Sequence, residues 1–348
     1  RVYELLTART KKIPNETSRQ QKARIAKADI EYRHAAWNLS QILLGPVTAQ
    51  LGTKRLLIVS DEALQNIPFA ALPEPSDARR QPLILEHEIV NLPSASTLAL
   101  LRRDLVGRKA PAKTVAVFAD PVFEATDLRV NQKSRSPKVA SKQQYQPSKT
   151  ARDRMESVAE SSDDGRKLRA IKDYLRRVGL VEEEQPLARL SYSRKEAQAI
   201  ASLVPEEQRK IVLDFGVNYD AVTNTQLSEY QFVHFATHGV LDPQEPELSG
   251  ILLSLVDEQG RPQENGILRL GDVYNLNLPV ELVVLSACET ALGKRVKGEG
   301  LVGLTRGFMY AGAPRVLASL WKVDEVATAD LMKLFYEGML GPRKLRPA

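Results

Sequence analysis

The chain has 348 residues, of which 43% are hydrophobic and 26% charged, enough to bury the core of one large α/β domain or two ordinary ones. Its formal net charge of +6 is modest and accompanies no stripe of aromatic and basic residues, so direct binding of nucleic acid is not favoured. The single cysteine excludes an intramolecular disulfide and is typical of a cytoplasmic protein, and no apolar run is long enough to predict a membrane span. Because the chain begins with Arg1 and carries no signal-peptide pattern, we expect a segment of a longer protein.

The first part of the chain predicts a long helix followed by short strands. Apolar residues recur with a period close to 3.6 from residue 16 to residue 44, and Gly45-Pro46 ends the pattern. We therefore expect residues 1–45 to form a helical segment that packs on the rest of the chain. Further on, the sequence predicts a short helix over residues 97–105, buried strands over residues 55–60 and 114–118, and a further strand over residues 84–92.

The composition changes between about residues 128 and 165, where Ser, Lys, Arg, Gln and Asp dominate. Such a segment buries too little apolar surface to offset the entropy lost on ordering, so we predict a mobile polar insertion. Its many basic residues would suit a self-cleaved or regulatory loop if the protein cut after Lys or Arg. The alternative is a tolerated surface insertion.

The second half alternates predicted strands with predicted helices. This alternation predicts an α/β fold with a mostly parallel central sheet that helices cover on both faces. Ser193 and Glu196 match a capping box that would open one helix. In the last helix we expect Leu331, Leu334, Phe335 and Met339 to face the core. The strands are predicted at residues 211–214, 231–237, 250–256, 281–287 and 315–321, and the helices at 193–203, 270–275, 300–311 and 326–340.

Two residues with the chemistry of a nucleophile and its base directly follow two of these strands. His238 follows the strand that ends at Thr237, and Cys288 follows the strand that ends at Ala287. Ligands of parallel sheets gather at the carboxyl ends of the strands, so neighbouring strands would bring thiol and imidazole together. The backbone N–H groups of Gly239 and Cys288 could then form an oxyanion hole. The spacing alone leaves open that the cysteine is a buried hydrophobe and the histidine a structural residue.

Two blocks around these residues resemble a known family. His234-Phe-Ala-Thr-His-Gly239 and Leu285-Ser-Ala-Cys-Glu-Thr-Ala-Leu-Gly293 are similar to the signature blocks of CHAT domains, which are caspase-like and often attached to TPR repeats. The resemblance implies a caspase-like peptidase domain over residues 46–340, with a tail at 341–348. It also implies cysteine-dependent peptide hydrolysis without a cofactor, with Cys288 as nucleophile and His238 as catalytic base. Further similar blocks are Ile67–Leu72, Gly298–Leu304, Ala318–Asp324 and Thr328–Met332.

The first histidine of the block, His234, would lie about 13 Å from His238 along an extended strand, at about 3.3 Å per residue. We therefore expect a structural role for His234 and no metal site formed by the two histidines.

The resemblance also suggests a substrate preference. Caspase-like peptidases such as separase, which share a Leu-Trp-x-Val pattern, read a basic P1 residue with a nearby carboxylate. The matching position here is Glu325, beside Asp324, although family members commonly carry Asp there; Glu289 is a weaker candidate. A carboxylate in the S1 pocket would favour Arg or Lys. The alternative is that Asp324 and Glu325 are solvated charges stabilised by a helix dipole.

The resemblance implies a protein substrate, control by a TPR-like or other sensor region on the same or another chain, and a role in bacterial defence or cell death. A competing hypothesis is a catalytically silent caspase-like scaffold or sensor. A third is a cysteine acyltransferase or non-peptide hydrolase, which would use the same dyad.

Overall fold

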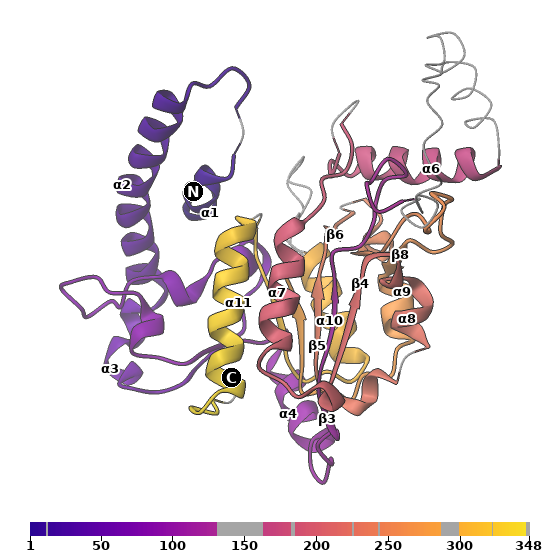
Figure 1. Ribbon diagram of the computed structural model, residues 1–348. Coiled ribbons are helices and arrows are strands. Elements are labelled where there is room, and N and C mark those ends of the chain that lie inside the picture. The colour runs from indigo at the N-terminus through magenta and orange to yellow at the C-terminus, as the bar shows by residue number, and fades with distance from the viewer. Residues whose placement is uncertain are drawn as a thin grey trace, which may run out of the picture.

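The structure is a computed structural model that describes residues 1–11, 13–130, 163–181, 185–224, 226–242, 244–286, 299–321 and 323–345. Its centre is a parallel five-stranded sheet with the strand order β10-β9-β5-β3-β4 (Figure 1). The strands are β3 (Lys113–Ala119), β4 (Arg209–Leu213), β5 (Tyr230–Ala236), β9 (Leu282–Leu285) and β10 (Val316–Ala318). The prediction of a mostly parallel central sheet is confirmed.

Helices cover both faces of this sheet, as predicted. Alternate residues of each strand point to opposite faces, so Phe118 and Phe235 pack on one side, while Val117 and Phe232 pack on the other. Because both faces are buried, the strands read as nearly continuous apolar runs. The first face packs against α8 (Tyr219–Thr223), α9 (Leu270–Tyr274) and α10 (Glu299–Tyr310), and the second against α7 (Ser191–Ala201) and α11 (Glu325–Leu340).

The N-terminal part forms a module of its own beside α11 (Figure 1). Its main element, α2 (Ser18–Leu43), begins with a capping box in which the Thr17 hydroxyl accepts from the Gln20 N–H and the Gln20 side chain accepts from the Thr17 N–H. The Tyr32 hydroxyl donates to the Ala71 carbonyl at 2.9 Å, which ties the helix to the following segment. The other elements are α1 (Val2–Leu6), α3 (Thr48–Leu51), β1 (Leu56–Ile58) and β2 (Ile89–Asn91).

The strand predicted over residues 55–60 is present as β1, but it is not buried. Leu57 is 44% exposed and Val59 52% exposed. The physical reason is that β1 pairs in parallel with β2 in a separate two-stranded sheet rather than in the central one. The division of the chain at residue 45 stays a prediction.

The remaining elements complete the molecule. A short antiparallel sheet, β6 (Gly239–Val240), β7 (Gly250–Leu252) and β8 (Ile267–Arg269), follows β5 directly. Two further helices are α4 (Ala95–Asp104) and α6 (Asp163–Arg177). Residues 131–162 of the predicted mobile insertion lie outside the described residues. Single 3₁₀ turns occur at Thr7–Arg9, Gly45–Val47, Glu62–Asn66, Phe69–Ala71, Leu83–Leu85, Glu206–Gln208, Asp214–Gly216, Leu227–Glu229 and Pro246–Leu248.

One prediction about the helices is wrong, and a second is right only in part. The predicted capping box does not open α7, which begins two residues earlier at Ser191. The Ser193 hydroxyl instead donates to the Leu190 carbonyl and accepts from the Asp120 N–H, and Glu196 is buried against His234. These side chains serve contacts with the sheet, so they are not available to cap the helix.

The buried face of α11 agrees with the prediction only in part. Met339 is buried and Phe335 packs against the core, as predicted, but Leu331 and Leu334 are each 60% exposed. Met332 and Tyr336 are buried instead. Both faces follow the period of a helix, so periodicity alone could not choose between them.

Within the described ranges, no helix combines the length and the apolar character that a bilayer span requires.

Candidate active site

The two strands that precede the predicted dyad are neighbours. β5 and β9 pair in parallel, with Phe235 opposite Leu285. In the sequence, His238 follows Phe235 by the same number of positions as Cys288 follows Leu285. The strand arrangement that the dyad hypothesis requires is therefore present. Cys288 itself, with Glu289, lies outside the described residues.

His238 is fully buried, and its ring is fixed on two sides. The Nε2 atom lies 2.8 Å from the carbonyl oxygen of Ala188. A carbonyl oxygen only accepts hydrogen bonds, so the ring donates from Nε2. A neutral imidazole that carries its proton on Nε2 has its basic lone pair on Nδ1. The Phe123 ring packs against the imidazole, with 5.1 Å between ring centroids.

Gly239 begins β6 with its backbone N–H turned away from β7. Gly239 stands opposite Ile251, and the Leu252 N–H donates to the His238 carbonyl at 2.8 Å. This pattern identifies Gly239 and Ile251 as a non-hydrogen-bonded pair of the antiparallel ladder. The Gly239 N–H is therefore not donated to β7.

His234 occupies a different environment, among buried side chains on the face of the sheet that α7 and α11 cover. Its Nε2 lies 2.9 Å from Glu196 Oε1, and its Nδ1 lies 3.2 Å from the Tyr336 hydroxyl. Burial, with the Glu196 carboxylate as a second cause, raises the pKa of Tyr336. These contacts join α7, β5 and α11, which is the arrangement of a structural histidine.

The predicted S1 carboxylates stand at the start of α11. This helix follows β10, the neighbour of β9, so both residues lie toward the carboxyl end of the sheet (Figure 1). Asp324 is exposed and is the N-cap, since its Oδ1 accepts the Ala327 N–H at 2.9 Å. The cap accounts for Asp324 without a role in binding. Glu325 is half-buried as the first residue of the helix.

A cluster of charged side chains around the buried Asp120, which the sequence did not predict, lies near His238 at the ends of β3 and β4. Asp120 follows β3 and is fully buried, and Asp214 follows β4; both have a φ of 54°. Burial raises the pKa of Asp214, but hydrogen bonds from Arg194 and Arg129 outweigh this and hold its pKa below its ordinary value. Residues from four separate segments meet here, so no local pattern could have indicated the cluster.

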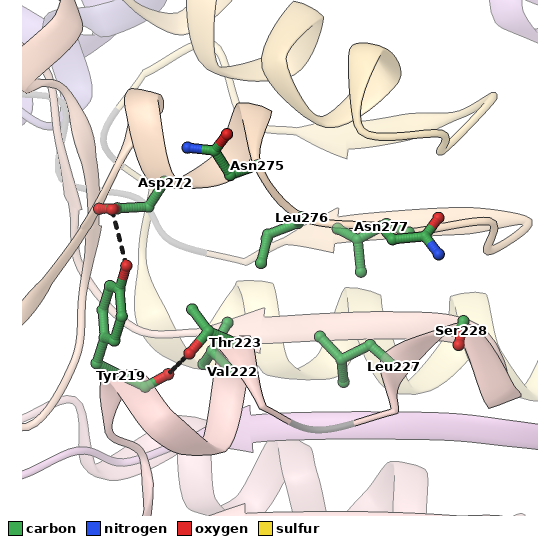
Figure 2. Close-up of a pocket in the computed structure, with 10 residues that line it drawn as sticks. Tyr219, Val222, Thr223, Leu227, Ser228, Asp272, Asn275, Leu276 and Asn277 are labelled. Atoms are coloured by element: carbon green, nitrogen blue, oxygen red, sulfur yellow. Dashed lines mark hydrogen bonds between the residues drawn. The ribbon is translucent and has the colours of Figure 1, made fainter.

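A pocket of about 340 Å³ lies between α8 and α9 (Figure 2). The Tyr219 hydroxyl donates to Asp272 Oδ1 at 2.9 Å and so joins the two helices at one end of it. None of the site residues predicted from the sequence lines this pocket.

Comparisons with known proteins agree with this architecture. A family model described as "CHAT domain" matches residues 33–348, nearly the whole chain. Tetratricopeptide repeat protein 28 of Mus musculus is 42% identical over 83 residues, which are 24% of this chain and 3% of that protein. Its counterpart in Homo sapiens is 39% identical over 87 residues, 25% of this chain and 4% of that protein. This chain therefore matches only a small part of the length of these curated relatives.

CHAT domains form a caspase-like, peptidase-related family, and the central parallel sheet with helices on both faces is consistent with such a fold. Because the match extends over far more than half of the sequence, this chain belongs to the CHAT domain family.

Proposed function

We propose that this chain is a cysteine endopeptidase in which Cys288 is the nucleophile and His238 its base. The observation that carries the proposal is the contact of 2.8 Å between His238 Nε2 and the Ala188 carbonyl. It holds the imidazole in the tautomer that keeps Nδ1 basic, as a proton acceptor for a thiol requires. The parallel register of β5 and β9 supports the assignment, because it aligns the two strands that lead to these residues.

The chemistry follows from these groups. His238 Nδ1 takes the thiol proton, and the thiolate attacks the scissile carbonyl carbon. The N–H groups of Gly239 and Cys288 stabilise the oxyanion, and the imidazolium then gives its proton to the leaving amine. Water, deprotonated by His238, hydrolyses the remaining thioester and restores the thiol.

Labelling with a thiol-directed peptide electrophile tests this proposal against a catalytically silent scaffold. Because the chain has one cysteine, any covalent adduct reports on Cys288. We expect labelling of the reduced protein at neutral pH that is faster than labelling of the denatured chain, with His238→Gln slowing the reaction. Cys288→Ala is the blank. A native thiol that reacts no faster than the denatured one, also in the presence of candidate partners, would favour the scaffold.

We further propose that Glu325 contributes to a preference for Arg or Lys at P1, with Asp324 and Glu289 as the other candidate carboxylates. Glu325 is half-buried although charged, and it begins α11 at the carboxyl end of the sheet. Removing this carboxylate would leave a bound basic side chain without its counter-charge.

We expect Glu325→Gln to lower kcat/KM for peptides with Arg or Lys at P1 by about tenfold or more, because a charge-assisted hydrogen bond is lost. A peptide library that varies P1 measures this. Glu325→Asp is the matched control that keeps the charge. Asp324→Asn removes the neighbouring charge while keeping a side-chain oxygen that can cap the helix, and it leaves Glu325 in place. An unchanged P1 profile in Glu325→Gln would assign the preference to another carboxylate, with Glu289 the next to test.

A regulatory partner is also proposed. The similarity to proteins named for tetratricopeptide repeats supports control by a TPR-like region on this or another chain. A cytoplasmic location is consistent with the single cysteine. The proposed substrate is a protein. A role in defence or cell death belongs to the same proposal.

A further inference from the structure

A short segment outside the helices and strands, residues 187–189, contacts the buried His238, and we call it the strap. Its middle residue supplies the carbonyl oxygen that accepts from His238 Nε2. A backbone oxygen can orient an imidazole only as well as the backbone itself is held. The neighbouring residues of the strap show how this is done.

The residue that follows the carbonyl, Arg189, is fixed by a two-point contact. Its Nε donates to Asp120 Oδ1 at 2.8 Å, and its Nη2 donates to Asp120 Oδ2 at 2.6 Å. A planar guanidinium paired in this way with a carboxylate fixes direction as well as distance. The carboxylate is fully buried, whereas the Arg189 side chain is 41% exposed.

Asp120 is itself held rigidly. Its N–H donates to Ser193 Oγ at 3.0 Å, and its Oδ2 also accepts from Arg194 Nε at 2.7 Å. Arg129 lies 3.1 Å from its Oδ1 and donates to its backbone carbonyl at 2.8 Å. Three arginines surround this one buried carboxylate and offset its desolvation. Asp120 directly follows β3, the strand that pairs with β5.

The other end of the strap is held independently. The Leu187 N–H donates to Glu124 Oε1 at 3.1 Å, and Lys172 of α6 donates to Glu124 Oε2 at 2.7 Å. The Leu187 side chain is buried in the same cluster as Phe123, whose ring packs against His238. The strap is thus held at the residue before Ala188 and at the residue after it.

We propose that Asp120 and Arg189 are positioning residues for His238, which act on the catalytic base through the Ala188 carbonyl. The inference deepens the proposed function and rests on it. In this arrangement the Ala188 carbonyl orients the base. The buried carboxylate of Asp120, directly after the adjacent strand β3, acts through the two hydrogen bonds that it accepts from Arg189.

The test substitutes Arg189 in the full chain. We expect Arg189→Gln to lower kcat for peptide hydrolysis by about 10- to 100-fold, with KM within about threefold of wild type, because the base loses orientation rather than substrate contact. NMR with ¹⁵N-labelled histidine provides a readout that needs no substrate. The chain has four histidines, so the imidazole N–H of His238 can be assigned by substitution. Its exchange with water should be about tenfold faster or more in Arg189→Gln, because the strap opens locally.

Two further variants separate positioning from general stability. Arg189→Lys keeps the charge but loses the planar two-point contact with Asp120. Its kcat and its His238 N–H exchange rate should therefore fall between those of wild type and Arg189→Gln. Arg194→Gln removes another arginine from the same carboxylate, but on α7 instead of the strap. Its His238 N–H exchange should stay within about threefold of wild type.

The outcomes are distinguishable. Wild-type exchange and kcat in a folded Arg189→Gln protein would overturn the proposal, as would equal effects of Arg189→Gln and Arg194→Gln on exchange. If Arg189→Gln does not fold, the comparison of Arg189→Lys with Arg194→Gln decides in the same way. If exchange separates the variants as expected but the wild type cleaves no peptide, the positioning role stands and the peptidase proposal fails.

Discussion

Cys288→Ala is expected to abolish peptide hydrolysis, and His238→Gln to lower kcat by about a thousandfold or more, as is usual when a member of a nucleophile–base unit is lost. The reason is that a thiol with an ordinary pKa is mostly protonated at neutral pH, and the leaving amine needs a proton donor. Initial rates on a fluorogenic peptide selected from the library measure the effect. The double variant should be no worse than Cys288→Ala alone.

The control for this prediction is a histidine outside the site. His34 is exposed on α2, so His34→Gln should retain the wild-type rate. Circular dichroism of each variant checks that the fold is kept. Substantial hydrolysis by folded Cys288→Ala would contradict the proposed mechanism, because no second thiol exists in the chain.

The largest loss of stability is expected from Phe235→Ala. Phe235 is fully buried in β5, where its ring stacks on Phe118 at 5.2 Å between centroids and packs against Phe308 at 5.9 Å. Truncation removes an aromatic ring and leaves a cavity, which costs about 3–5 kcal/mol in the free energy of unfolding. Urea unfolding followed by circular dichroism should show a lower midpoint with an unchanged slope.

Leu334→Ala is the matched control for this truncation. Because Leu334 is 60% exposed on α11, its loss should change the free energy of unfolding by no more than about 0.5 kcal/mol. A large effect of Leu334→Ala would mean that this face of α11 is covered in solution. A small effect of Phe235→Ala would contradict the packing of the sheet on α10.

The central fold could be predicted because its signals are local. The apolar runs around Val117, Phe235 and Val284 are long enough to indicate buried strands, and the alternation with helices fixes the parallel sheet. The exposure of β1 could not be predicted in the same way. Whether an apolar strand joins the central sheet or a separate one depends on partners distant in the sequence, and Leu57 carries no mark of that choice.

The candidate site was predictable only in part, for a related reason. A histidine at the end of a strand is visible in the sequence, and the topology then places His238 at the carboxyl end of the sheet. The group that orients it is the carbonyl of Ala188, and a backbone atom leaves no trace in the identity of its residue. Asp120 and Arg189 are far apart in the sequence, and their contact becomes apparent only in the folded structure.

The predicted capping box is the opposite case, because here a local pattern is present in the sequence but does not determine the structure. Ser193 and Glu196 have the right spacing, but both side chains turn toward the sheet, one to Asp120 and the other to His234. A helix cap contributes only about 1 kcal/mol to stability, so it does not form when the same side chains can satisfy buried polar groups instead.

The pairing of β3 with β4 sets how freely the sequence between them can change. Ala119 lies opposite Leu213, so their pairing closes a stretch of chain that includes α6 and α7 into a loop. The entropic cost in free energy of closing such a loop rises only with the logarithm of its length, by about 0.6 kcal/mol for each doubling. Lengthening or shortening the polar insertion predicted at about residues 128–165 should therefore barely change the unfolding equilibrium, and its length would then be free to vary among related proteins.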